Sequence, residues 1–190
     1  MSSAPNRRWS IAAHPLSLGG KKKKVSIFQR PLDLVFVIFF VTHVPTTLFV
    51  DCQCILPAEY FPKACHDLLQ FHLDNFKDPL MGTCPAWLRS IIWCELLLQV
   101  PFFLAATYAF VCSKNWIRLP ALMYGIHTAT TLVPILGSLW LNSDAKLSDV
   151  ERLTLTGIYL PYLVMPLLLA LKMLASKAPF GEDKSQNKNE

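Results

Sequence analysis

A few titratable side chains lie inside the long apolar stretches of this 190-residue chain. His43 is in the middle of the first stretch, Asp51 lies at its end, and Glu95 is in the second. An ionisable group costs about 2.5–3.5 kcal/mol or more at the centre of a membrane, so each of these residues indicates a functional site. Structural roles stay open, because His43 could bond a backbone carbonyl and Asp51 could be an interfacial carboxylate in water.

Polar residues in the second and third stretches recur at helical spacing. Glu95 and Gln99 are four residues apart and therefore share one face of a helix. His127 and Thr131 have the same spacing in the third stretch. A threonine in a helix often bonds back to its own backbone, which is the alternative role for Thr131. Pro101 follows Gln99 and is expected to kink the helix there.

The polar stripes are expected to face a common interior. Tyr159 and Tyr162 add hydroxyls in the fourth stretch, although an aromatic belt at the membrane surface is the alternative. Lipid-facing positions disfavour polar groups, so a bundle turns them inward and forms an apolar cavity with a few polar groups, as in small-molecule sites. The acids Asp51, Asp78 and Glu95 favour a ligand with a cationic amine, or a hydroxyl donor on a flat apolar body. Two close carboxylates tend to share a proton.

Four apolar runs must position these residues. The expected spans are about 32–50, 87–112, 119–141 and 153–174, and a bilayer needs about 17–25 residues per helix. Apolar residues make up 53% of the chain and charged residues 16%, against about 25% charged residues in soluble domains. The sequence predicts an all-α membrane protein, a bundle of four transmembrane helices. The expected domains are a disordered basic tail (1–30), the membrane domain (31–175) and a polar tail (176–190).

Flanking charges predict the topology. Seven Lys and Arg residues precede the first run, and the connector 51–86 carries five acids against two lysines, a net charge of 2 − 5 = −3. Lys- and Arg-rich ends stay in the cytosol, so both termini are expected there and the connector on the lumenal side. Although the net charge is +5, no basic face interleaved with aromatic residues follows the N-terminal cluster, so a nucleic-acid partner is not expected.

The connector 51–86 is too long and too apolar for a plain loop. Pro57 with Glu59 can start a helix, and apolar residues recur at roughly helical spacing up to Phe76. We expect an amphipathic helix that lies at the lumenal interface or folds over the bundle.

Six cysteines add a further possibility. Cys52, Cys54, Cys65 and Cys84 fall in the expected lumenal region, where disulfides can form. Their alternative role is that of small buried apolar residues. The pair Cys52 and Cys54 has no second pair at ligand spacing, so no metal site is expected, and nothing in the sequence calls for a cofactor.

Many segments, in order, resemble the sigma-2 receptor family (transmembrane protein 97). The likeness covers about residues 32–175. This family belongs to the EXPERA superfamily, which also contains the emopamil-binding sterol isomerases. The segments that carry the resemblance are His43–Asp51, Phe76–Leu80, Pro85–Trp87, Cys94–Gln99, Pro101–Phe103, Ala106–Phe110, Trp116–Arg118, His127–Leu132, Glu151–Leu155 and Tyr159–Tyr162.

The resemblance implies a four-helix protein of the endoplasmic reticulum membrane, with the nuclear envelope or other endomembranes as further locations. It implies a homodimer with a cavity that binds sterols or oxysterols and cationic amphiphilic molecules, and a sterol-transport membrane protein as a partner. Asp51 would pair with a ligand amine, and Asp78 would hydrogen-bond and orient Asp51. The other implied lining residues are His43, Phe76, Glu95, Gln99, Thr131, Ile158 and Tyr162.

Two positions depart from the family pattern. Vertebrate members carry a tyrosine where this chain has His72, which predicts a difference in ligand preference. The C-terminal residues Asn187–Glu190 are not a dilysine retrieval signal, so the resemblance does not account for retention in the reticulum.

Three functions fit these residues. The first is a non-enzymatic protein that binds sterols and amines and serves sterol homeostasis. The second is a sterol double-bond isomerase, because His43, Glu95 and Asp51 are acid and base groups of the kind that reaction needs. The third is a trafficking chaperone for another membrane protein. The resemblance favours the first.

Overall fold

The computed structural model describes residues 26–142 and 146–181. All regular elements in this part of the chain are helices. Four of them are long and apolar enough to cross a membrane: Pro31–Cys54, Ala86–Val111, Asn115–Leu141 and Asp149–Ala175. The predicted fold class, an all-α membrane protein with four spans, is confirmed.

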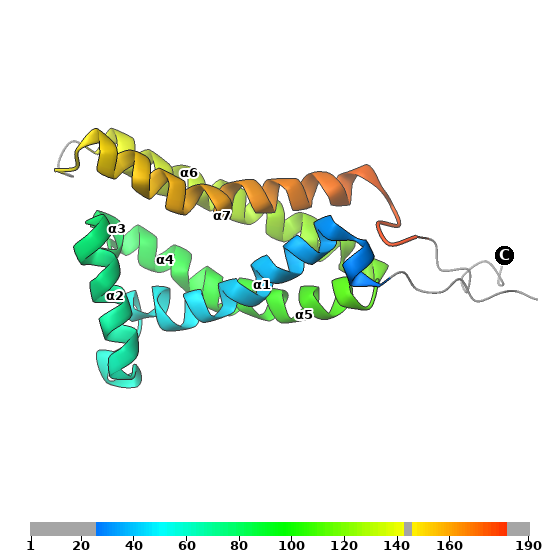
Figure 1. Cartoon of the computed structure of the whole chain (residues 1–190), viewed down its shortest axis with the longest axis horizontal. Coiled ribbons are helices and arrows are strands. Elements are labelled where there is room, and N and C mark those ends of the chain that lie inside the picture. The colour runs from blue at the N-terminus through cyan, green and yellow to red at the C-terminus, as the bar shows by residue number, and fades with distance from the viewer. Residues whose placement is uncertain (1–25, 143–145, 182–190) are drawn as a thin grey trace, which may run out of the picture.

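The spans pair two by two (Figure 1). Helix α1 (Pro31–Phe49) packs along α5 (Val100–Val111), and α6 (Arg118–Leu141) packs along α7 (Asp149–Ala175). The start of α1 and the end of α7 lie at the same end of the bundle. Helix α2 (Lys63–Phe76) runs crosswise to the spans at the opposite end.

The outer surface of the bundle is apolar. Only 22–39% of the residues in the most apolar window of each span are buried inside the protein. Large side chains such as Leu97, Leu104 and Met123 are more than half exposed. An apolar surface of this extent suits hydrocarbon and not water, so these faces contact lipid.

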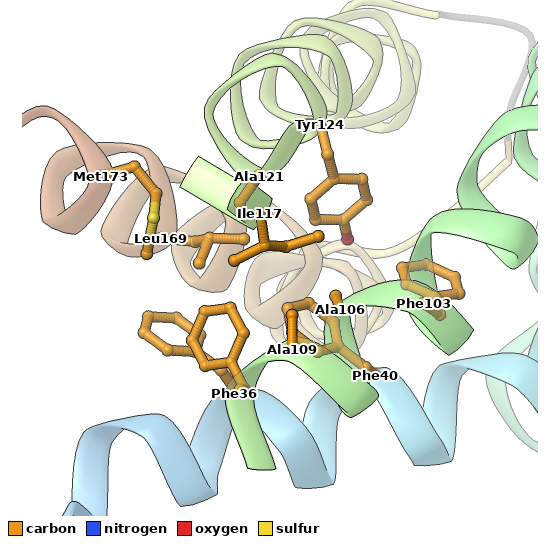
Figure 2. Close-up of a cluster of buried hydrophobic side chains, with 11 residues drawn as sticks. Phe36, Phe40, Phe103, Ala106, Ala109, Ile117, Ala121, Tyr124, Leu169 and Met173 are labelled. Atoms are coloured by element: carbon orange, nitrogen blue, oxygen red, sulfur yellow. The ribbon is translucent and has the colours of Figure 1, made fainter. Parts of the chain in front are cut away.

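Aromatic rings fill the bundle at the end where α1 begins and α7 ends (Figure 2). Phe36 and Phe40 of α1 are fully buried against Phe103 of α5, and the Phe40 and Phe103 ring centroids are 6.0 Å apart. Leu169 and Met173 of α7 complete this cluster. Fully buried side chains thus occupy this half of the bundle.

Small residues bring α6 and α7 together. Ala121, Gly125 and Ala129 are spaced four apart on α6 and are all buried. A Cβ atom added at Gly125 would lie 2.6 Å from the Pro166 carbonyl oxygen and 2.9 Å from the Ala170 Cβ. Helices in membranes use such small-residue faces to approach closely.

The substitution Gly125→Ala is therefore expected to destabilise the protein. The added methyl group meets backbone on α7, and overpacking of this kind costs about 1–3 kcal/mol. Gly157→Ala is the matched control, because nothing lies within 4 Å of a Cβ at that position of α7. The control should leave the melting temperature unchanged or raise it, since alanine suits a helix better. Thermal unfolding in detergent measures both; equal melting temperatures would contradict the close approach.

Two helix boundaries differ from those expected. Helix α7 begins at Asp149 and not near residue 153, because Ser148 and Glu151 form a reciprocal capping box. Helix α2 begins at Lys63 and not near Pro57. A short 3₁₀ turn precedes it, and Phe61 is extended, as a residue before proline tends to be.

Ordered contacts extend past both expected limits of the membrane domain. Arg30 donates to the Phe110 carbonyl at 2.7 Å. Asn115 binds the Phe180 N–H at 3.0 Å and the Gly181 carbonyl at 2.7 Å. Disorder is expected for residues 1–30 and 176–190, of which residues 1–25 and 182–190 lie outside the described residues.

Candidate functional site: an acidic cavity within the bundle

A cavity of about 400 Å³ lies between the helix pairs, on the α2 side of the aromatic cluster. Residues of α1, α2, α6, α7 and the second span line it. Its polar lining includes the carboxylates of Glu95 and Asp51. Aliphatic and aromatic side chains form the rest of its wall.

The second span is interrupted where it meets the cavity. Helix α4 (Ala86–Cys94) runs into a π-helical turn, Glu95–Gln99, and then into α5. The Val100 N–H bonds to the Glu95 carbonyl, five residues back. Pro101 has no N–H to offer the carbonyl four residues before it, which explains why the regular pattern fails just here. The wide turn keeps Glu95 and Gln99 on the cavity side, and such turns are frequent at functional sites.

Glu95 forms the polar group deep in the bundle. Its Oε1 atom lies 3.1 Å from His43 Nε2 and accepts a hydrogen bond from the Thr47 hydroxyl at 2.5 Å. The His43 ring is held between the rings of Phe103 and Tyr162, each with its centroid 4.7 Å away. The partner of His43 is thus a carboxylate and not the backbone carbonyl of the alternative interpretation. This pair can exchange a proton, and it can accept a hydrogen bond from a donor group of a ligand.

Gln99 is held by its neighbour across the bundle. The Thr128 hydroxyl donates to Gln99 Oε1 at 3.2 Å. The Thr131 hydroxyl donates to the Thr128 carbonyl at 2.9 Å, as a threonine in a helix often does. Thr131 nevertheless lines the cavity. His127 is not among the residues that line the cavity.

Asp51 also lines the cavity, four residues after Thr47, whose hydroxyl binds Glu95. It opens a 3₁₀ turn, Asp51–Cys54, that continues the first span beyond α1. The residue is partly buried and its side chain faces the cavity. Glu95 and Asp78 are both close enough to interact electrostatically with it. The three acids named from the sequence are therefore brought to one region by three different elements.

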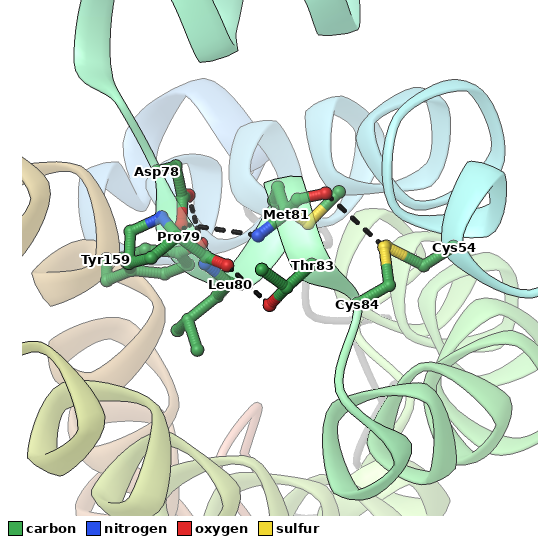
Figure 3. Close-up of a disulfide and its surroundings, with 8 residues drawn as sticks. All are labelled: Cys54, Asp78, Pro79, Leu80, Met81, Thr83, Cys84 and Tyr159. Atoms are coloured by element: carbon green, nitrogen blue, oxygen red, sulfur yellow. Dashed lines mark hydrogen bonds between the residues drawn. A yellow bond between two sulfur atoms is a disulfide. The ribbon is translucent and has the colours of Figure 1, made fainter. Parts of the chain in front are cut away.

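Asp78 does not line the cavity but supports residues that do (Figure 3). It is the N-cap of α3 (Pro79–Thr83), and its carboxylate accepts from the Leu80 and Met81 N–H groups. The other oxygen binds His72 Nε2 at 2.9 Å and the Tyr159 hydroxyl at 2.6 Å. These partners line the cavity. The orientation of Asp51 by Asp78, which the resemblance implies, stays a prediction.

The surroundings of Asp78 predict a pH dependence of stability. Burial acts to raise the pKa of this carboxyl, but hydrogen bonds from His72, Tyr159 and two backbone N–H groups outweigh it and hold the pKa below its usual value of 3.8. A carboxyl with a lowered folded-state pKa stabilises the fold above its unfolded pKa, and this contribution is lost as the pH falls through the folded pKa. In a series of melting temperatures measured from pH 7 to pH 3, the melting temperature should decrease once the pH is lower than about 4. Asp78→Asn should be less stable at pH 7 and should show a smaller fall; an unchanged profile would contradict this.

The structure places eight of the nine predicted site residues along the cavity. They are His43, Asp51, Phe76, Glu95, Gln99, Thr131, Ile158 and Tyr162. The ninth, Asp78, acts through His72 and Tyr159. Their roles toward a ligand stay predictions.

Further lining residues were not singled out as site residues from the sequence. Leu68 and Phe71 of α2 belong to the wall, as do Leu88 and Ile92 of α4. The apolar pattern of the connector is the signal that pointed to the first two. Leu88 and Ile92 are apolar residues in an apolar span, so nothing in their type or spacing distinguishes them from lipid-facing neighbours.

Four membrane-spanning helices around an acidic intramembrane cavity define a multi-pass membrane protein with a buried polar site. The model of the family "EBP: EXPERA (EXPanded EBP superfamily)" matches residues 64–173. The chain belongs to this EXPERA superfamily and, within it, to the family of sigma intracellular receptor 2.

Curated relatives carry this assignment. The chain is 42% identical to sigma intracellular receptor 2 of Macaca fascicularis and 41% identical to that of Homo sapiens, each over 170 residues, 84% of this chain and 97% of the relative. It is 26% identical over 145 residues to "Efficient mitochondria targeting-associated protein 19" of Saccharomyces cerevisiae, covering 69% of this chain and 90% of that protein. The resemblance inferred from the sequence motifs is confirmed.

Proposed function

We propose that this membrane receptor-like protein binds sterols and cationic amphiphilic ligands in its acidic cavity and serves sterol homeostasis without transforming the ligand. The observation that carries the proposal is the presence of two carboxylates, Asp51 and Glu95, on the wall of an otherwise apolar cavity inside the membrane domain.

The chemistry of the cavity supports an amphiphile. A buried ammonium group needs a carboxylate partner, because removal of a charge from water is costly unless it is paired. Asp51 supplies this partner at the connector end. Glu95 or Gln99 can accept a hydrogen bond from a hydroxyl deeper in the bundle. Phe76, Ile158 and Leu132 offer apolar contacts to a flat ring system between these points. A volume of about 400 Å³ suits a small molecule.

The same proposal includes the cellular setting. We place the protein in the endoplasmic reticulum membrane, as a homodimer with both termini in the cytosol and a sterol-transport membrane protein as partner. The alternation of charge along the connectors supports this orientation. A disulfide between Cys54 and Cys84 fits an oxidising lumenal side for the connector.

Ligand binding tests the proposal directly. Purified protein should bind a radiolabelled cationic amphiphile saturably, and a hydroxylated sterol should displace it. An uncharged analogue, in which carbon replaces the amine nitrogen, should compete much more weakly. Absence of saturable binding, or equal competition by the uncharged analogue, would contradict an acidic amine site.

The pair of His43 and Glu95 favours a second candidate function, sterol double-bond isomerisation. An isomerase needs an acid to protonate the alkene and a base to remove a proton elsewhere, and these side chains lie 3.1 Å apart on the cavity wall. We expect a sterol with a shiftable double bond to be recovered unchanged after incubation with the protein. If the double bond moves only in the presence of the protein, and does not move with the Glu95→Gln variant, the protein is an isomerase and the receptor proposal is wrong.

A further inference from the structure

We propose that the disulfide between Cys54 and Cys84 is a positioning element that holds Asp51 at the cavity, so that its reduction lowers the affinity for cationic ligands. This inference rests on the proposed function, because it assigns the control of the same site. It makes the oxidation state of two cysteines a determinant of ligand binding.

The disulfide joins the two short elements that carry the acids (Figure 3). Cys54 ends the turn that Asp51 begins. Cys84 is the C-cap of α3, the helix that Asp78 caps at its other end. The Cα atoms of the two cysteines are 5.5 Å apart. A displacement of either element is therefore transmitted to the other.

The Asp51 turn contacts its neighbours mainly through side chains, because Cys54 and the adjoining Ile55 pack against an apolar cluster that includes Leu80 and Leu88. Its backbone hydrogen bonds, such as Ile55 N–H to the Cys52 carbonyl, are local. The side chain of Gln53 reaches the Cys65 carbonyl on α2 at 3.0 Å. Within the described residues, the disulfide is the covalent link between this turn and the corner between α3 and α4. It thus adds a covalent restraint to the apolar packing and the Gln53 hydrogen bond that hold this turn.

The backbone of Cys84 supports a specific role for the bond. Its φ angle is 42°, in the left-handed region that favours glycine. A residue with a side chain costs about 1 kcal/mol or more there and persists where its surroundings fix it. The Cys84 N–H donates to the Leu80 carbonyl at 2.9 Å, and the cross-link to Cys54 adds a covalent restraint on this backbone.

The cross-link also closes a loop that carries part of the cavity wall. The two cysteines are 30 residues apart, and the loop between them contains α2, α3 and the cavity residues Leu68, Phe71, His72, Phe76 and Met81. Reduction by a dithiol transfers two electrons and two protons, opens the S–S bond to two thiols and leaves the reagent as its own disulfide. The connector and the Asp51 turn can then move independently, which misplaces the carboxylate relative to a bound amine.

The test compares the wild type with the double variant Cys54→Ser/Cys84→Ser. The probes are a radiolabelled cationic amphiphile and its uncharged carbon analogue. We expect the variant to bind the cation about tenfold more weakly, a loss of about 1.4 kcal/mol, and the analogue with unchanged affinity. Dithiothreitol should weaken binding of the cation to the wild type by the same factor and have no effect on the double variant. Cys94→Ala, which alters a free cysteine that does not line the cavity, is the matched control.

The outcomes separate the positioning role from a purely structural one. Equal affinity of the wild type and the double variant for the cation, or an equal loss for both probes, would overturn the inference. If the wild type binds neither probe, the proposed ligand-binding function is itself wrong, and the inference about the disulfide falls with it. Amide hydrogen exchange then tests the positioning itself, since exchange at residues 51–56 should rise on reduction; unchanged protection there would refute it.

Discussion

The substitution Asp51→Asn is expected to weaken binding of a cationic amphiphile by about 100-fold, because it removes one member of a buried charge pair. Asparagine keeps the shape of the side chain and removes its charge. The carboxylate faces the cavity from the turn at the end of the first span. Equilibrium binding of the radiolabelled probe measures the effect.

The reason lies in the surroundings of the ligand. Lipid and apolar side chains surround the cavity, so an ammonium group placed there has little water to solvate it. Without the Asp51 charge, the nearest carboxylate on the wall is that of Glu95, which already accepts hydrogen bonds from Thr47 and contacts His43. The remaining groups cannot replace a full negative charge at the connector end.

Asp67→Asn is the matched control for this prediction. Asp67 lies on α2, is largely exposed and pairs with Lys63 at 2.8 Å. Its substitution removes the same charge from the same side of the bundle without a change to the cavity wall. Binding to this variant should equal that of the wild type. A similar loss in both variants would mean that long-range attraction, and not contact with Asp51, holds the amine.

The largest expected effect on stability follows the substitution Asp33→Asn. This carboxylate lies in the first turn of α1, at the end of the bundle opposite α2, and its side chain is 4% exposed. It binds Arg30 Nη1 at 2.9 Å and also the Lys172 ammonium group at the end of α7. Phe180 covers both cations, with Arg30 Cζ 5.4 Å and Lys172 Nζ 5.7 Å from its ring centroid.

Removal of the Asp33 charge leaves two cations side by side in a mostly apolar setting. Loss of one partner from a buried ion pair costs about 3–5 kcal/mol, so the melting temperature in detergent should fall markedly. Asp67→Asn again serves as control, since an exposed pair contributes at most about 1 kcal/mol. Equal melting temperatures for the two variants would show that water reaches the Asp33 cluster in solution.

The four spans and their polar residues follow from the sequence by itself. A hydrocarbon layer sets the length of a spanning helix and penalises charge, so apolar runs and the exceptions within them can be recognised locally. The spacing of Glu95 and Gln99 likewise predicts a shared polar face, whereas the π-helical turn that carries them was not evident from the sequence. The expected locations of His43, Asp51 and Tyr162 were likewise predictable from single runs.

Only the tertiary structure decided which distant groups meet. Four cysteines were candidates for a disulfide, and the fold brings Cys54 and Cys84 within bonding distance. Asp78 is directed to His72 and Tyr159, and Asp33 meets Lys172, 139 residues further along the chain. These pairings depend on how the helix pairs pack and where α2 crosses the bundle. Periodicity in the sequence shows which face of a helix is polar. The partner of that face is set by packing between helices, and the separation of two helices in sequence does not tell how close they lie in space.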